Sequence, residues 1–158
     1  MSIFSKQKDS GGINSPVIGK AKTLKSLKDG VFSEEMMGKG VVVEPKDNKF
    51  YAPISGILTT VFPTKHAYGI TNKKGVSVLV HIGIDTVALK GKGFKTMVTQ
   101  GSKIKQGDLL CEVDLEFVSK NAPTTDTVIV ITPETTAQTE VKITSGSVTT
   151  ETELIIIK

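Results

Sequence analysis

Short runs of alternating apolar and polar residues follow one another along most of the chain, separated by turn-forming residues. A period of two residues places successive side chains on opposite faces of a strand. Clusters of Gly, Pro, Asn and Asp mark the turns. The pattern predicts strands over 17–24, 40–44, 49–52, 56–62, 67–71, 76–82, 94–98, 109–113, 127–131, 140–143 and 153–157. Many short strands at this spacing indicate an all-β, antiparallel sandwich or barrel.

Helical character is confined to two short segments. In the stretch 114–121, Asp114 can cap a helix whose apolar face holds Leu115 and Val118, and Pro123 ends it. Residues 33–37 are expected to add a single turn. The helices of the predicted fold are therefore minor additions to the strands.

Length and composition support this interpretation. The chain has 158 residues, is rich in Thr, Val and Ile, and contains only 5% aromatic residues, which favours sheet over helix. We expect one domain over 16–158 after a mobile N-terminal segment, 1–15, whose Ile3 and Phe4 also suit a short membrane-contacting helix. No apolar run approaches the ~20 residues of a membrane-spanning helix, and no secretion signal precedes the domain. A cytoplasmic location is expected, with the single cysteine, Cys111, as a small core residue.

The net charge of the chain does not indicate a nucleic-acid partner. The net charge is +4 and the isoelectric point about 9.1, but all 20 basic residues are Lys. Forked recognition of phosphates and guanine edges depends on Arg, and base stacking depends on aromatic residues, of which Trp is absent. The lysines are scattered singly, so we expect no nucleic-acid partner.

Two histidines are the strongest candidates for chemistry. The even-numbered residues from Val76 to Ile84 are all apolar, which predicts that they face the core. His81 therefore faces away from the core, on the same side as Leu79 and Gly83. Asp85 follows four residues later, roughly 13 Å along an extended strand, too far for a hydrogen bond to His81 unless Gly83 bends the chain.

The second histidine, His66, is predicted at the entrance of a strand. Pro63 ends the preceding strand, and Tyr68 begins the next one. Thr64 lies two residues before His66, close enough for its hydroxyl to bond an imidazole nitrogen and fix the tautomer.

The segment from Val80 to Phe94 resembles the signature of the glucose-family enzyme IIA of the bacterial sugar phosphotransferase system. The likeness extends from 17 to 158, through 32–40, 52–56, 62–67 and 145–148 in the same order. It implies an antiparallel β-sandwich that acts as a phosphotransferase component. By position, the resemblance implies that His81 is phosphorylated on Nε2 by the carrier protein HPr and passes the group to the enzyme IIB domain of a glucose-type sugar permease. It also implies that His66 donates a hydrogen bond to the phosphoryl oxygens and that Thr64 holds His66.

The same resemblance implies a partner-binding surface around the two histidines. Its apolar residues are Val31, Phe32, Met36, Met37, Phe62, Leu79 and Val87, and its carboxylates are Asp29 and Asp85. We expect both imidazoles side by side in a shallow apolar depression open to solvent. No resident cofactor is expected. Zinc is expected to bind at His66 and His81 only where a partner supplies a carboxylate. Regulated transporters or kinases are further candidate partners.

Three alternatives remain open at this point. The spacing of His81 and Asp85 matches half of the zinc ligand set of lysostaphin-like peptidases, but such sites also need an H-x-H pair. The stretch 102–110 has the strand-turn pattern of biotinyl and lipoyl domains, without their lysine hairpin. A regulatory binding module that never carries phosphate is the third alternative.

Overall fold

The structure is a computed structural model and describes residues 9–158. Its strands are β1 (Ile13–Asn14), β2 (Gly19–Thr23), β3 (Lys39–Pro45), β4 (Lys49–Tyr51), β5 (Gly56–Val61), β6 (Ala67–Thr71), β7 (Ser77–Ile84), β8 (Phe94–Thr96), β9 (Lys103–Ile104), β10 (Leu109–Val113), β11 (Thr124–Ile131), β12 (Thr139–Val141), β13 (Gly146–Val148) and β14 (Glu153–Ile157). Its helices are the 3₁₀ turns η1 (Leu24–Leu27) and η2 (Thr86–Leu89) and the α-helix α1 (Leu115–Asn121).

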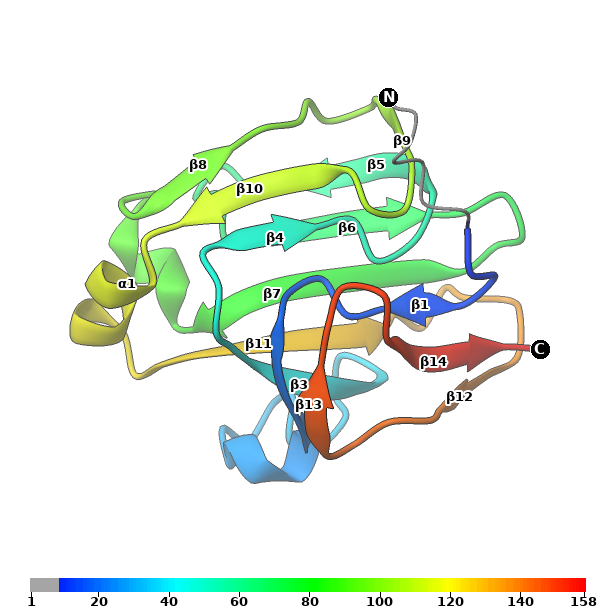
Figure 1. The fold of residues 1–158 in the computed structure, drawn as a ribbon, viewed down its shortest axis with the longest axis horizontal. Coiled ribbons are helices and arrows are strands. Elements are labelled where there is room, and N and C mark those ends of the chain that lie inside the picture. Colours follow the sequence, from blue (N-terminus) through cyan, green and yellow to red (C-terminus); the bar gives the residue numbers. More distant parts are fainter. Residues whose placement is uncertain (1–8) are drawn as a thin grey trace.

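The strands form one large sheet and two small ones (Figure 1). The large sheet has the order β13-β2-β3-β11-β7-β6-β5-β9, and the small sheets have the orders β1-β14-β12 and β4-β10-β8. All pairings are antiparallel. Side chains of both small sheets share one buried cluster with the inner face of the large sheet. The predicted antiparallel β-sandwich is therefore confirmed.

The alternation of β7 places two sets of side chains on opposite faces. Val76, Val78, Val80 and Ile82 all belong to the main core between the sheets. A second, smaller cluster covers part of the outer face of the large sheet and consists of Leu24, Phe32, Val42, Ala67, Leu79, Val128 and Val130. Strand β7 thus separates a structural face from the face that carries His81.

The alternation fails at Ile84, which was expected on the core face. Ile84 packs against the outer cluster instead. The reason is Gly83, whose φ of +76° lies in the left-handed region that glycine adopts without steric cost and that turns the chain. The strand is bent at the residue next to the site.

Most of the predicted elements are present. Helix α1 begins where the capping pattern placed it, since the Asp114 carboxylate accepts a hydrogen bond from the Phe117 N–H at 3.1 Å. The expected turn at 33–37 is a series of turns, closed by hydrogen bonds such as that from the Gly38 N–H to the Glu35 carbonyl at 3.1 Å.

Three strands were missed, and one of them changes the domain boundary. Strands β1, β9 and β13 are only two or three residues long, too short to show a period. β1 lies inside the segment expected to be mobile, yet Ile13 is fully buried and β1 pairs with β14. The folded domain therefore begins before residue 16. The suggested membrane contact of Ile3 and Phe4 lies outside the described residues. Within residues 9–158, no helix has the length and apolar character needed to cross a membrane.

Candidate functional site

His81 stands on the outer face of the large sheet, near its centre. β7 lies between β6 and β11, and the register partners of His81 are Ala67 and Val128. Both partners have small side chains, which leaves room above the sheet for an imidazole ring. The alternation read from the sequence thus gives His81 the orientation that the structure shows.

His66 reaches the same place from the loop between β5 and β6. The loop turns through Lys65, which has a φ of +65° and whose N–H donates to the Phe62 carbonyl at 2.7 Å. The His66 carbonyl then accepts a hydrogen bond from the Ile82 N–H at 2.7 Å, which fixes His66 beside β7. The centroids of the His66 and His81 rings lie 4.7 Å apart, with an angle of 81° between the ring planes.

Each ring uses its Nδ1 atom for a hydrogen bond within the protein. His81 Nδ1 lies 2.7 Å from the Gly83 carbonyl oxygen, and His66 Nδ1 lies 2.8 Å from the Thr64 hydroxyl. Because a carbonyl oxygen can only accept, the neutral His81 ring carries its proton on Nδ1 and leaves a lone pair on Nε2. The Thr64 hydroxyl can donate to or accept from His66 Nδ1, and where it donates, the His66 proton lies on Nε2. In that case, Nε2 of His81 is an acceptor and the Nε2–H of His66 is a donor.

Two phenylalanines pack against the histidines, and they cover them unequally. The centroid of the Phe32 ring lies 5.0 Å from that of the His81 ring, and the centroid of the Phe62 ring lies 5.3 Å from that of the His66 ring. His66 is only 2% exposed, whereas His81 is partly exposed. The expectation that both rings are open to solvent is therefore wrong for His66, because Phe62 and His81 themselves cover it.

Burial keeps both rings uncharged at neutral pH. Desolvation lowers the pKa of His66 to about 4, aided by the neighbouring His81 and opposed by a hydrogen bond to the Thr64 backbone. Desolvation also lowers the pKa of His81, although the Gly83 carbonyl, Asp29 and Asp85 act in the opposite direction. A neutral imidazole is nucleophilic without further activation.

The loop from Asp29 to Gly38 forms one side of the site. The Asp29 carboxylate accepts hydrogen bonds from the N–H groups of Val31, Phe32 and Ser33 at 3.3, 3.1 and 2.9 Å. Burial raises the pKa of Asp29, but these N–H donors outweigh burial and the net pKa is lowered. Asp29 therefore remains charged and holds the turn that brings Phe32 onto His81.

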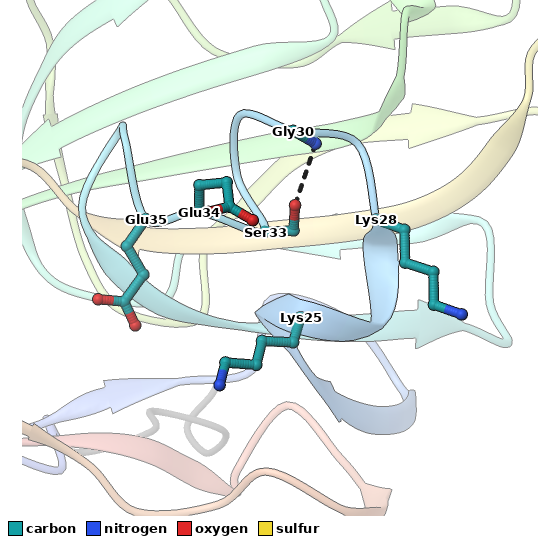
Figure 2. A pocket seen from close by; sticks show the side chains of 6 residues that line it. All are labelled: Lys25, Lys28, Gly30, Ser33, Glu34 and Glu35. Atoms are coloured by element: carbon teal, nitrogen blue, oxygen red, sulfur yellow. Dashed lines mark hydrogen bonds between the residues drawn. The ribbon is translucent and has the colours of Figure 1, made fainter.

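A hollow lies behind this loop, next to η1. Figure 2 shows the hydrogen bond that closes the turn, from the Gly30 N–H to the Ser33 hydroxyl at 3.0 Å. Two basic, two acidic and two uncharged residues line the hollow: Lys25, Lys28, Glu34, Glu35, Gly30 and Ser33. Because two lysines and two glutamates line it, the hollow favours no charged ligand of one sign.

The remaining residues of the predicted surface divide into buried and exposed sets. Leu79 is 8% exposed and, like Phe32, belongs to the outer cluster, against which Phe62 packs. Four apolar residues are exposed: Val31, Met36, Met37 and Val87. Asp85 is also exposed and precedes η2 with a φ of +58°.

Sequence reasoning missed one functional group, the Gly83 carbonyl. It bonds His81 Nδ1 from two residues along the same strand, which the left-handed φ of Gly83 makes possible. The signal in the sequence was the glycine itself, considered there only as a residue that could bend the chain and bring Asp85 toward His81.

The described part of the chain contains no cluster of three or more His, Cys, Asp and Glu side chains suited to a metal ion. Cys111 is buried, and burial raises the pKa of its thiol to about 12. The residues that could act chemically are therefore the two imidazoles and the groups that orient them.

Comparison with known proteins identifies the class to which this fold and this histidine pair belong. Residues 12–137 match the family model described as phosphoenolpyruvate-dependent sugar phosphotransferase system, EIIA 1. The chain therefore belongs to the EIIA 1 family of this phosphotransferase system, whose members carry phosphoryl groups from HPr to IIB. This membership disagrees with the metallopeptidase and biotinyl-domain alternatives.

Two particular proteins show how close the relationship is. The glucose-specific EIIA component of Mycoplasma capricolum subsp. capricolum is 49% identical over 117 residues, which cover 74% of this chain and 76% of the relative. The solved structure of glucose permease IIA from Mycoplasma capricolum superposes with a TM-score of 0.86 at 41% identity. The superposition covers 98% of this chain and 99% of that one.

Proposed function

We propose that His81 is the phosphoryl carrier of this chain, taking the group on Nε2 from the phosphohistidine of HPr and passing it to a IIB domain. The observation that supports this most strongly is the hydrogen bond of His81 Nδ1 to the Gly83 carbonyl at 2.7 Å. It leaves Nε2 as the only free nucleophilic atom of a neutral, partly exposed ring. The names of the relatives suggest a glucose-type sugar permease as the recipient.

The transfer balances without an added acid or base. The Nε2 lone pair of His81 forms a bond to phosphorus while the P–N bond to the HPr imidazole breaks, and the HPr ring recovers its lone pair. The Nδ1 proton of His81 stays in place, where the Gly83 carbonyl stabilises the positive charge that develops on the ring. Because the phosphoryl transition state is loose, alignment of the two nitrogens and exclusion of water account for most of the catalysis.

His66 acts as a hydrogen-bond donor to the transferred group. With the Thr64 hydroxyl donating to Nδ1 at 2.8 Å, the Nε2–H of His66 is available to a phosphoryl oxygen on His81. Its low pKa, about 4, keeps the ring neutral, so it donates without becoming a permanent cationic partner for the phosphate. A neutral donor holds the group in place and still releases it.

Docking of the partner supplies the rest of the site. The apolar residues Val31, Met36 and Val87 are 43%, 67% and 55% exposed and suit an apolar partner surface that excludes water. The carboxylates of Asp29 and Asp85 favour basic groups on that partner, and such groups also compensate for the absence of Arg in this chain. HPr and IIB are partners of this kind. Transporters and kinases as further partners, and zinc completed by a partner carboxylate, stay predictions.

Phosphorylation with purified components tests the proposal. Incubation with phosphoenolpyruvate, enzyme I and HPr should add one acid-labile phosphate to the chain, and His81→Gln should abolish the gain. His66→Gln serves as the matched variant, because it should still accept phosphate but pass it to IIB poorly. Phosphate uptake by His81→Gln would overturn the assignment of His81, and normal delivery by His66→Gln would remove His66 from the mechanism. No uptake by the unmodified chain would instead favour the regulatory module.

A further inference from the structure

Thr86 lies directly behind the bend of β7 that carries Gly83. It is fully buried, and its hydroxyl donates to the Ile82 carbonyl at 2.6 Å. The N–H of Ile82 donates to the His66 carbonyl at 2.7 Å. Ile82 is therefore held through its N–H by His66 and through its carbonyl by Thr86.

The methyl group of Thr86 contacts the same bend from another direction. A Cβ atom placed on Gly83 would lie 2.5 Å from Thr86 Cγ2 and 2.9 Å from the Thr124 carbonyl oxygen. A side chain at position 83 therefore has no room between Thr86 and β11. Thr86 holds the carbonyl before the bend with its hydroxyl, and its methyl group lies on the side of Gly83 where a side chain would project.

The ladder between β7 and β11 does not provide this restraint. Ile84 pairs with Thr124 and Ile82 pairs with Thr127, so the register shifts opposite Gly83. The backbone on either side of an irregularity of this kind is less constrained by strand pairing. The bend also contains Asp85 at a φ of +58°, in the left-handed region that is uncommon for residues other than glycine.

We infer that Thr86 is a positioning residue for phosphoryl transfer: it holds the bend so that the Gly83 carbonyl keeps the proton of His81 on Nδ1 and leaves Nε2 free. The inference rests on the proposed role of His81 as carrier. Thr86 touches neither the phosphoryl group nor the partner, and it acts through Gly83. Without its hydroxyl, the Gly83 carbonyl can rotate away, and the His81 proton is then shared between the two ring nitrogens.

The tautomers of the two histidines provide a direct readout. In protein with ¹⁵N-labelled histidine, NMR at pH 7.5 should show His81 protonated on Nδ1 and His66 protonated on Nε2. Thr86→Val keeps the Cγ2 methyl group and replaces the hydroxyl with a second methyl group, and it should give a mixture of tautomers for His81 alone. Thr86→Ser keeps the hydroxyl and should retain the single tautomer. His66 serves as the internal reference, since its Thr64 partner is unchanged.

Transfer kinetics supply the second readout. The rate of phosphoryl transfer from phospho-HPr should fall roughly tenfold or more in Thr86→Val, because small misplacements of reacting atoms are costly. The KM for phospho-HPr should stay unchanged, since no docking residue is altered. Thr135→Val is the matched control: its hydroxyl donates to the Ser77 carbonyl at 3.2 Å, at the opposite end of the same strand, and its loss should leave both readouts unchanged.

Two comparisons distinguish a failure of this inference from a failure of the variant to fold and from a failure of the proposed function. If Thr86→Val does not fold, Thr86→Ala and Thr86→Ser differ only in the hydroxyl, and the mixed tautomer should appear in Ala alone. If the unmodified chain takes up no phosphate, the proposed function fails, whereas the tautomer measurement still decides whether Thr86 orients His81. The inference would be overturned if the hydroxyl-free variant kept His81 as a single Nδ1–H tautomer and transferred phosphate within twofold of the rate of the unmodified chain.

Discussion

Leu79 and Val80 are neighbours on β7, but they belong to different parts of the molecule. Val80 is buried between the sheets, in a cluster that continues through the whole sandwich. Leu79 belongs to the small cluster on the outer face, on the same side of the strand as His81. The comparison shows that one strand supplies stability with one face and chemistry with the other.

The two faces of β7 also differ in the polar groups that pack against them. Two imidazoles pack against the outer cluster, each with a hydrogen-bond partner from its own loop or strand. The main core contains mostly apolar side chains, and the Tyr68 hydroxyl within it bonds the Thr96 hydroxyl at 2.8 Å. Substitutions on the inner face should therefore change the free energy of unfolding, and substitutions on the outer face should change phosphoryl transfer.

Val80→Ala should have the largest effect on stability. Removal of two buried carbons leaves a cavity between the sheets and should lower the free energy of unfolding by about 2–3 kcal/mol. Urea denaturation measures this loss. Transfer at 20 °C should remain within twofold of the unmodified chain, and a large loss of transfer in a folded Val80→Ala protein would contradict the separation of the two faces.

Acidification should lower stability by a comparable amount through His66. The folded-state pKa of His66 is about 4, below its ordinary value of 6.5, so the unfolded chain binds a proton first as the pH falls. Stability is therefore complete at neutral pH and decreases as the pH falls from about 7 toward 4, by about 2 kcal/mol between pH 7 and pH 5. Denaturation curves of the unmodified chain and His66→Gln, compared at both values, isolate this contribution. Equal pH dependence of the two proteins would show that His66 is not held neutral by the fold.

Leu79→Ala should have a smaller effect on stability, although it removes one carbon more than Val80→Ala. Leu79 is 8% exposed and lies in the smaller cluster on the outer face, so the loss should be about 2 kcal/mol, at the low end of the range for a buried Leu→Ala substitution. The rate of transfer from HPr at low HPr concentration should fall about tenfold, because Leu79 belongs to the cluster that holds Phe32 against His81 and against which Phe62 packs. A loss of stability greater than that of Val80→Ala would show that Leu79 is a core residue instead.

Lys65→Ala should have the smallest effect. Lys65 lies between Thr64 and His66, but its part in the site is the backbone turn, in which its N–H donates to the Phe62 carbonyl. Since we expect positive charge at the transition state to come from HPr and from N–H groups, transfer should slow less than threefold. A reduction of several hundredfold in steady-state transfer would mean that the Lys65 ammonium contacts the phosphoryl group.

The inner face and the strands were predictable from the sequence because their signal is local. Alternation in β7 predicts which way His81 points, and Asp114 marks the start of α1 within one residue. Strands of two or three residues, such as β1 and β9, carry no period, and their pairing partners are distant in sequence.

The details of the site depend on contacts that no local pattern contains. The left-handed conformation of Gly83 moves Ile84 to the outer face and turns a carbonyl onto His81. The burial of His66 results from packing against Phe62 and His81, which the fold brings together. Pairing of the two histidines could be inferred from the family resemblance, whereas the unequal exposure of the two rings could not.

The most direct test of the account is the position of the phosphate. After phosphorylation by HPr, ³¹P and ¹⁵N NMR of histidine-labelled protein should show one phosphohistidine, with phosphorus bonded to Nε2 of His81 and the proton retained on Nδ1. Phosphorus on Nδ1 of His81, or on either nitrogen of His66, would contradict the arrangement in which the Gly83 carbonyl selects the reacting atom.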